Sequence, residues 1–113
     1  MFPLARFRVE ERSMSPAVGP GDYVLVNRWA YRSHAPEVGD LVVLRNPERE
    51  GQFLCKRIAG VTDSGAYVVL GDNTAASRDS RQFGPVPRGL IVGKVWRSAR
   101  AGPRGPARPE SPP

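Results

Sequence analysis

The sequence has few of the residues that build cross-links and metal sites. Among its 113 residues there is one cysteine, Cys55, and one histidine, His34. One cysteine cannot form a disulfide within the chain, and this pair excludes both cysteine-only and multi-histidine metal sites. We therefore expect no metal, and no pattern in the sequence indicates a cofactor. We interpret Cys55 as a packing residue and His34 as a solvated loop residue.

Long apolar runs are also missing. No stretch approaches the roughly 18 apolar residues that a membrane span needs, and the first nine residues are interrupted by Pro3, Arg6 and Arg8. This beginning has the pattern of neither a signal peptide nor a membrane anchor. We expect a chain that is cytoplasmic or peripheral at a membrane, with no transmembrane segment.

Lysine is almost absent from an otherwise basic chain. The 17 cationic residues and 11 acidic residues give a net charge of +6, yet only Lys56 and Lys94 are lysines. Arginine keeps its proton in a protein, whereas a lysine removed from water can lose it. The two lysines are therefore the cations to consider for acid–base chemistry.

The end of the chain differs in composition from the rest. Residues 98–113 hold five of the 12 prolines, three arginines and one glutamate. Such a segment cannot bury enough apolar surface to offset its conformational entropy. We predict a disordered Pro/Arg-rich tail over 98–113 and a single folded domain over 1–97, a length that suffices for one core.

Short apolar segments separated by turns predict an all-β domain. Gly and Pro interrupt the chain about every ten residues, which is typical of a small barrel or sandwich of short antiparallel strands. The predicted strands cover residues 7–10, 23–26, 41–44, 53–58, 66–70 and 90–96, with turns at 20–22, 38–40 and 62–65. Gly93 is a candidate bulge in the last strand, and residues 29–31 are the only candidate helix.

A serine stands in a stiffened turn after the first predicted strand. Ser13 begins the run Ser-Met-Ser-Pro, in which Pro16 fixes its own φ and favours an extended Ser15. A serine at a strand end in such a turn is well placed to project its hydroxyl. The same pattern is also that of an ordinary turn with no chemistry.

Lys56 lies in a segment with the two-residue period of a strand. That period places it on the face of Leu54 and Ile58, with Cys55 and Arg57 on the opposite face. If the first face is buried, loss of hydration favours an uncharged amine, which can act as general base toward a serine hydroxyl. The alternative is a lysine that extends from a strand edge into solvent.

A dense polar run lies between the last two predicted strands. It contains Gly71-Asp72-Asn73, then Ser77-Arg78-Asp79-Ser80-Arg81, then Phe83-Gly84. Polar residues this dense predict a loop, in which Asp79 and Arg81 can pair and Ser77 can hold an amine. A well-capped polar turn without chemistry is the alternative.

These three segments, in this order, resemble the type I signal peptidase family. That family has a serine in a Ser-Met-x-Pro box, a lysine in a Lys-Arg box on a later strand, and a Gly-Asp-Asn box followed by Ser-x-Asp-Ser-Arg and Phe-Gly. The likeness runs from about Phe7 to Trp96. It implies a small signal-peptidase-like β-barrel or sandwich and a serine endopeptidase, with Ser13 as nucleophile and Lys56 as general base.

The resemblance also implies roles for neighbouring residues and partners. Ser77 would orient the lysine amine, and Asp79 and Arg81 would form a structural ion pair beneath it, while Met14 would support the serine box. The implied reaction removes an N-terminal leader or signal segment from a precursor protein. The implied partners are that precursor and a peripheral membrane contact.

Two features depart from the family pattern. Glu11 stands where the family usually has a small or hydroxylated residue, and an ionised carboxylate cannot donate a hydrogen bond to an oxyanion. The family also carries an N-terminal membrane anchor, which this sequence does not show. Its short anchorless relatives include the maturation proteases of nickel-type superoxide dismutase, which form the narrower hypothesis. A start codon assigned too far downstream would leave the same sequence.

Two other classes of protein are alternatives. The SOS-repressor autopeptidases share the Ser-Met box and a later Lys-Arg, but this chain has no DNA-binding domain and no obvious internal cleavage loop. The other alternative is a catalytically inactive or non-enzymatic basic β-barrel that binds nucleic acid, with the aromatics of residues 29–31 available for stacking. The net charge gives only weak support to a nucleic-acid partner.

The predicted strands also suggest how a substrate would bind. Residues 7–12 lead into Ser13, and residues 53–56 end at Lys56. If both segments border one cleft, a substrate can lie between them as an extended strand held by main-chain hydrogen bonds.

Overall fold

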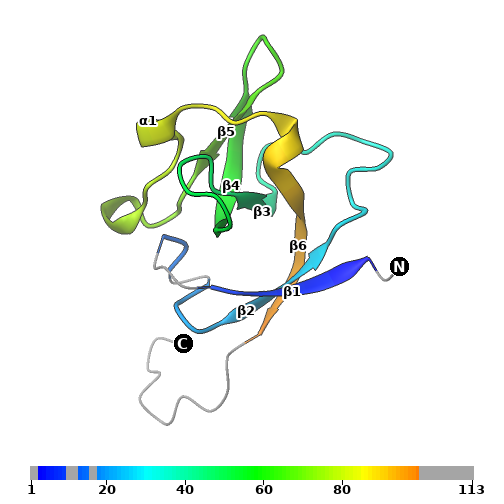
Figure 1. Ribbon diagram of the computed structural model, residues 1–113, viewed down its shortest axis with the longest axis vertical. Coiled ribbons are helices and arrows are strands. Elements are labelled where there is room, and N and C mark those ends of the chain that lie inside the picture. Colours follow the sequence, from blue (N-terminus) through cyan, green and yellow to red (C-terminus); the bar gives the residue numbers. More distant parts are fainter. Residues whose placement is uncertain (1–2, 10–12, 16–17, 100–113) are drawn as a thin grey trace.

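The computed structural model describes residues 3–9, 13–15 and 18–99, and these form a mainly antiparallel β structure (Figure 1). The strands are β1 (Leu4–Arg8), β2 (Tyr23–Asn27), β3 (Leu41–Arg45), β4 (Phe53–Val61), β5 (Tyr67–Leu70) and β6 (Ile91–Ala99). The helical elements are η1 (Thr74–Ala76), α1 (Ser80–Phe83) and η2 (Arg88–Leu90). The predicted all-β class is therefore confirmed.

The strands form one sheet in the order β1-β2-β6-β3-β4-β5. Every pair of neighbours is antiparallel. β6 joins the two halves of the sheet, because its first residues pair with β3 and its last ones with β2. Figure 1 shows the result as two wings, one of β1 and β2 and one of β3, β4 and β5, connected by the long β6. β1 is an edge strand, whereas β4 has a neighbour on each side.

Each predicted strand overlaps one observed strand. β6 continues to Ala99, past the predicted domain end at residue 97. Residues 100–113, which include most of the predicted tail, lie outside the described residues, and so does Glu11. The domain boundary and the tail therefore stay predictions.

The turns before β2 and β3 are built alike. Gly21 and Gly39 have φ of 87° and 99°, a left-handed conformation that glycine adopts at little steric cost. The aspartates that follow them, Asp22 and Asp40, accept hydrogen bonds from backbone N–H groups three residues earlier, at 2.8 and 3.1 Å. These side chains close each turn and set the start of the next strand.

Two helical turns, η1 and α1, lie in the polar run predicted as a loop, and η2 includes Leu90, which the sequence predicts as the start of the last strand. α1 begins at a capping box, in which the Asp79 side chain accepts from the Arg81 N–H at 3.0 Å and the Gln82 side chain accepts from the Asp79 N–H at 2.8 Å. The Asp-x-x-Gln spacing is a sequence signal for such a start. Residues 29–31, the only candidate helix, form a turn. Within the described ranges, no helix has the length and apolar character needed to cross a bilayer.

Two hydrophobic clusters pack on opposite faces of the sheet. Alternation along β3 separates them, because Val42 and Leu44 belong to one cluster and Val43 to the other. The buried members of the first are Tyr31, Val42, Leu44, Leu54, Ile58, Tyr67, Val69 and Val86. Those of the second are Val9, Met14, Val18, Val24, Val26, Val43 and Cys55. The interpretation of Cys55 as a packing residue is confirmed.

Gly93 lies between two irregularities of β6. The pairing with β3 omits Val92, and the pairing with β2 omits Trp96. A Cβ on Gly93 would lie only 2.5 Å from the carbonyl oxygen of Asn27. The bulge predicted at Gly93 therefore falls one residue earlier, and the glycine itself permits the close approach of the end of β2.

Candidate active site

Both residues of the predicted dyad are buried. Ser13, in the turn that follows β1, has 1% of its surface exposed, and Lys56, in the middle of β4, has none. Lys56 shares its strand face with Leu54 and Ile58, which are also buried, as the two-residue period predicts. The alternative of a lysine that extends into solvent does not hold.

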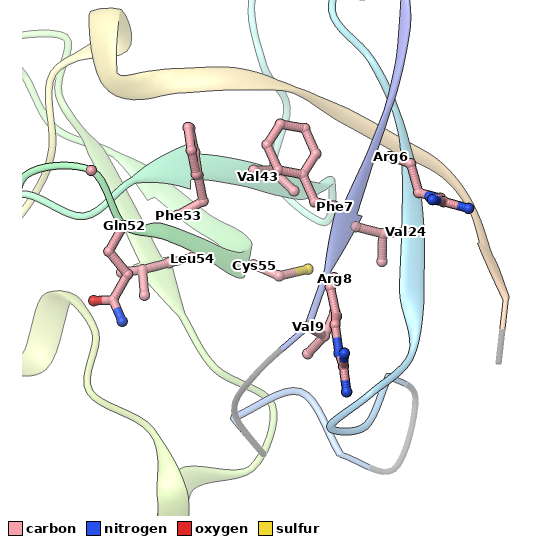
Figure 2. A pocket seen from close by; sticks show the side chains of 11 residues that line it. Arg6, Phe7, Arg8, Val9, Val24, Val43, Gln52, Phe53, Leu54 and Cys55 are labelled. Atoms are coloured by element: carbon pink, nitrogen blue, oxygen red, sulfur yellow. The ribbon is translucent and has the colours of Figure 1, made fainter. Parts of the chain in front are cut away.

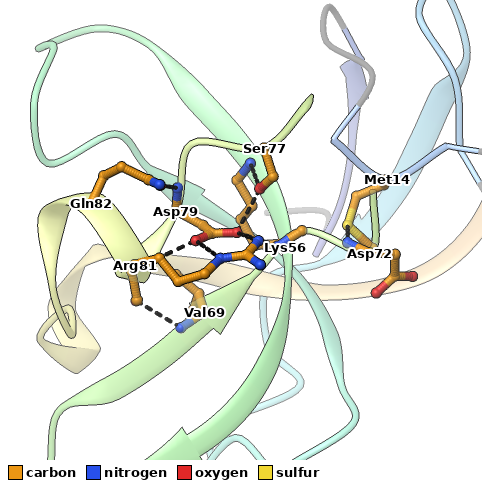
Figure 3. A network of polar contacts seen from close by, with 10 residues as sticks. Met14, Lys56, Val69, Asp72, Ser77, Asp79, Arg81 and Gln82 are labelled. Carbon is orange, nitrogen blue, oxygen red and sulfur yellow. Dashed lines mark hydrogen bonds and ion pairs between the residues drawn. The ribbon is translucent and has the colours of Figure 1, made fainter. Parts of the chain in front are cut away.

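The backbone around Ser13 is fixed to the segment that follows β5. The Ser13 carbonyl oxygen accepts a hydrogen bond from the Asn73 N–H at 2.7 Å. Met14 is buried, and its Sδ accepts from the Asp72 N–H at 3.3 Å (Figure 3). The Met14 carbonyl accepts from the Val18 N–H at 3.0 Å and closes the turn. These contacts join the Ser-Met box to the Gly-Asp-Asn box.

The Asp79 carboxylate has no exposed surface but is surrounded by donors. Its Oδ2 accepts from the Gly71 N–H at 2.8 Å, the Ser77 hydroxyl at 2.5 Å and the Arg81 guanidinium at 2.6 Å. Its Oδ1 accepts from the backbone N–H and the Nε of Arg81, both at 3.0 Å. Burial by itself raises the pKa of a carboxyl, but these donors, the Arg81 side chain foremost, hold the pKa of Asp79 well below its usual range.

A chain of polar side chains runs from Lys56 to this carboxylate (Figure 3). The Lys56 Nζ lies 3.3 Å from the Ser77 Oγ, which lies 2.5 Å from the Asp79 Oδ2. An ionised carboxylate only accepts hydrogen bonds, so the Ser77 proton is donated to Asp79. The Ser77 oxygen must then accept from the lysine. One N–H of Lys56 is thereby oriented toward Ser77, and the rest of the amine is directed away from it.

Gly71 lies where the Ser13 segment and Ser77 meet. A Cβ on Gly71 would lie 2.2 Å from the Ser77 Oγ, 2.7 Å from the Ser77 Cβ and 2.8 Å from the Ser13 carbonyl oxygen. Real Cβ atoms do not approach other atoms so closely, so only glycine fits here without displacing one of the two. Ser13 and the hydroxyl partner of Lys56 therefore pack against the same backbone atom.

A pocket of about 350 Å³ lies between β1 and β4 (Figure 2). Residues 6–9 line one side and residues 51–55 the other. The Phe7 and Phe53 rings approach across it, with their centroids 5.0 Å apart, and Cys55 points into the same space (Figure 2). The described parts of the two predicted segments, 7–9 and 53–55, thus border one cleft, as expected from the sequence.

The remaining candidates lie away from this network. His34 is exposed in the loop after β2, and its ring packs edge-on against Tyr31 with the centroids 5.7 Å apart. Among residues 3–9, 13–15 and 18–99, no group of three His, Cys, Asp or Glu side chains could hold a metal ion.

Two ion pairs lie next to Lys56 and Ser77, and the sequence does not predict either of them. Arg57, next to Lys56, donates to Asp72 at 2.7 and 3.2 Å. Arg78, next to Ser77, donates to Glu48 at 2.6 and 2.7 Å. The partners are 15 and 30 residues apart in the sequence, so no local pattern predicts them. All four side chains keep some contact with water, so each pair contributes little to stability.

One family model matches most of the chain. It is described as signal peptidase, peptidase S26, and it matches residues 1–62 and 62–98. Among curated relatives, the mitochondrial ATP-independent inner membrane protease subunit 1b of Arabidopsis thaliana is 38% identical, over 83% of this chain and 71% of its own length. The mitochondrial inner membrane protease subunit 2 of Danio rerio is 31% identical, over 82% and 64%. Subunit 1 of Schizosaccharomyces pombe is 37% identical, over 74% and 65%. The chain thus spans about two thirds of the length of these relatives.

The first prediction concerns the stability that Asp79 supplies. Its pKa is lower in the folded than in the unfolded protein, so its contribution is complete above the unfolded value near 4 and is lost as the pH falls below that value. Asp79→Asn should lower the free energy of unfolding at pH 7 by about 2 kcal/mol, because Arg81 stays partly solvated, and should flatten its dependence on pH below about 5. Urea unfolding at a series of pH values measures both effects. Asp63→Asn, in an exposed turn, is the control; equal losses in the two variants would contradict the assignment.

The second prediction concerns the space at Gly71. Gly71→Ala should lower the free energy of unfolding by about 1–3 kcal/mol, because the added methyl overlaps Ser77 and the Ser13 carbonyl. Gly60→Ala is the matched control, since a Cβ there meets only Val68, at 4.0 Å. Denaturant unfolding of the two variants should separate them clearly. A Gly71→Ala protein as stable as Gly60→Ala would show that the two segments are not packed against this glycine.

Proposed function

The chain belongs to the signal peptidase family, peptidase S26, and from that premise we propose that it is a serine endopeptidase with Ser13 as nucleophile and Lys56 as general base. The reaction proposed is the removal of an N-terminal leader or signal segment from a precursor protein. The observation that carries the proposal is the buried Lys56 amine, oriented by a Ser77 hydroxyl whose own proton is committed to Asp79.

The proposed reaction begins with a proton transfer. A neutral lysine amine has two N–H groups and one lone pair, so an amine that donates to Ser77 keeps its lone pair for the proton of the Ser13 hydroxyl. The Ser13 Oγ then bonds to the scissile carbonyl carbon. The Ser13 backbone N–H is the proposed donor to the resulting oxyanion. An ionised Glu11 side chain cannot donate a second hydrogen bond to the oxyanion, so any further donor would have to be another group.

The second half of the proposed reaction returns the proton. The Lys56 ammonium protonates the leaving amine, the C–N bond breaks, and the acyl group stays on Ser13 as an ester. Lys56, neutral again, takes a proton from water, and the hydroxide attacks the ester carbonyl. Collapse of that intermediate breaks the ester bond, and the Lys56 ammonium returns its proton to the Ser13 oxygen, which restores the hydroxyl and the neutral amine. In this scheme Ser77 is a positioning residue for the amine, and Asp79 with Arg81 keeps Ser77 in place.

The pocket between β1 and β4 supports an extended substrate. β1 is the edge of the sheet, so its outward N–H and C=O groups are available for a further strand. A peptide added there would run along residues 7–9 toward Ser13 and face residues 53–55, the end of the segment that holds Lys56. Main-chain hydrogen bonds would supply most of the affinity. The Phe7 and Phe53 rings, 5.0 Å apart, would limit the side chains that fit.

The precursor is proposed only by its class. The relatives are named as inner membrane proteases of mitochondria, and for this chain we propose peripheral contact with a membrane. Maturation of a nickel-type superoxide dismutase, the narrower hypothesis from the sequence, stays a prediction. Membership of a peptidase family makes the nucleic-acid module the weaker alternative.

The dyad generates a prediction about activity. Ser13→Ala and Lys56→Ala should each lower kcat for cleavage of a leader-bearing precursor by about 1,000-fold or more, and the double variant should be no worse, because the two residues act as a unit. Mass spectrometry of the precursor after incubation with each purified variant measures the loss. His34→Ala is the control and should keep the wild-type rate and the wild-type dependence of rate on pH. Near-normal cleavage by Lys56→Ala would overturn the assignment of the base.

The extended binding mode generates a prediction about substrates. Peptides with proline next to the cleaved bond should lose about tenfold or more in kcat/KM, because proline removes a main-chain donor. Matched peptides with N-methylalanine at the same position should lose as much in kcat/KM. N-methylalanine also lacks the main-chain N–H, but its side chain is not closed into a ring. Peptides with a bulky residue just before the cleaved bond should also have a lower kcat/KM, because the Phe7 and Phe53 rings narrow the pocket. Equal rates for all these peptides and their alanine parent would exclude binding as an added strand.

A further inference from the structure

The pocket between β1 and β4 is bordered by the edge of β1 and not by one of its faces. Four consecutive residues, 6–9, line it (Figure 2), and successive side chains of a strand point to opposite faces. Phe7 is half-buried and Val9 is buried, whereas Arg6 and Arg8 are exposed. A peptide lying along this edge would therefore meet apolar and cationic side chains in alternation.

The main-chain groups that face the pocket belong to the two arginines. Pro3 and Val9, at the two ends of the β1 pairing, direct their carbonyl oxygens to the chain at the ends of β2, with N···O distances of 2.9 and 2.8 Å. The direction of these groups alternates along a strand, so residues 3, 5, 7 and 9 bond toward β2. The N–H and C=O groups of Arg6 and Arg8 then point to the open edge. A strand added there would bond to these two residues and would place every second side chain beside theirs.

The positive charge at this edge is available to a substrate. The Arg6 guanidinium lies 4.6 Å from the centre of the Tyr23 ring, a contact that leaves its charge in place. Arg6 forms no ion pair with an acidic side chain of the residues that the structure describes. The interior of the pocket differs, because Val24, Val43 and Leu54 are among its lining residues. The pocket thus has an apolar interior and a cationic rim along β1.

From this arrangement we propose that the pocket selects substrates with an acidic side chain at the second and fourth residues before the cleaved bond. The inference rests on the proposed function, in which the residue just before that bond enters the apolar pocket. Side chains alternate along an extended strand, so the third residue enters the pocket too. The second and fourth residues lie on the opposite face, beside Arg6 and Arg8. The two arginines are therefore specificity-determining residues that take no part in the chemistry.

The selection is a graded preference, because single charge pairs across a sheet are weak. Opposite charges that face each other across two strands favour the pairing, and like charges oppose it, each by about 2–5-fold in affinity. Two acidic residues together would raise the affinity by about tenfold. Lysine at the same positions would lower it, which discriminates against basic segments. An acid at the third position would be buried among apolar side chains and would weaken binding.

Peptide binding to the full-length Ser13→Ala protein tests this preference apart from the chemistry. The probes are fluorescent peptides that are identical except for Asp, Asn or Lys at the second, third or fourth residue before the bond, and fluorescence anisotropy measures Kd. At the second and fourth positions, Asp should bind about 2–5-fold more tightly than Asn, and Lys about 2–5-fold more weakly. At the third position, Asp should bind more weakly than Asn. The charge preference should shrink as the salt concentration is raised from about 0.05 to 0.5 M.

Arginine variants in the same background assign the preference to residues. Arg6→Gln and Arg8→Gln should each remove the preference for Asp at one of the two positions, and the corresponding Glu variants should reverse it in favour of Lys. Arg32→Gln is the matched control. Its guanidinium also lies against an aromatic ring, 4.5 Å from the centre of Trp29, but it does not line the pocket. With Ser13 intact, charge at the two positions should change KM and leave kcat unaltered, because the contact is the same in the ground state and the transition state.

Four results would overturn the proposal. These are the absence of measurable binding by any peptide, equal Kd values for Asp, Asn and Lys, a preference that survives both Arg→Gln changes, and an equal loss in Arg32→Gln. Cleavage by the wild type without a charge preference would refute this inference alone. Peptide binding with the expected preference but without cleavage by the wild type would refute the dyad and leave the specificity in place. Urea midpoints of the arginine variants, which change only exposed side chains, establish that the proteins compared are folded.

Discussion

The buried carboxylate of Asp79 is the constraint on which the rest of the site depends. A charge removed from water must be satisfied by donors, and those of Asp79 come from Gly71 after β5, from Ser77 and from Arg81 in α1. Each donor holds a further part of the site. Gly71 packs against the Ser13 carbonyl, and Ser77 meets the Lys56 amine. A polar loop that has no hydrophobic core of its own thereby acquires one fixed conformation.

The sheet supplies the rigid frame against which this loop is held. Lys56 lies in β4, which is paired on both sides, so its amine is held within the fold. β1 lies at the edge, where it can accept an added strand beside the pocket. β6 connects the wing of β1 and β2 to the wing of β3, β4 and β5. The sheet order thus separates two tasks, because the proposed base lies in an inner strand and the proposed substrate groove lies beside an edge strand.

The sequence predicts the strands well, because alternation of apolar residues reports directly on which face is buried. The same period places Lys56 with Leu54 and Ile58 on a buried face, and the Gly-Asp pairs mark the turns before β2 and β3. The helical turns were not predicted. A dense run of polar residues indicates a loop unless the spacing of Asp79 and Gln82 is recognised as that of a capping box. Contacts between distant segments, such as Gly71 with Ser77 and Ser13, Phe7 with Phe53, and Arg57 with Asp72, depend on the path of the backbone and leave no local signal. The family boxes identify the candidate residues. The roles of those residues in catalysis stay predictions.

The central claim is that Ser13 becomes covalently bonded to the acyl part of the substrate, and trapping that ester tests it most directly. The protein would be mixed with an activated peptide ester, quenched in acid within the first turnover, and mapped by mass spectrometry of proteolytic fragments. An added acyl mass is expected on the fragment containing Ser13 in the wild type, and no such mass is expected in Ser13→Ala or Lys56→Ala. Cys55, which lines the neighbouring pocket, is the alternative nucleophile. An acyl mass on Cys55, or continued turnover of the ester by Ser13→Ala, would show that Ser13 is not the nucleophile.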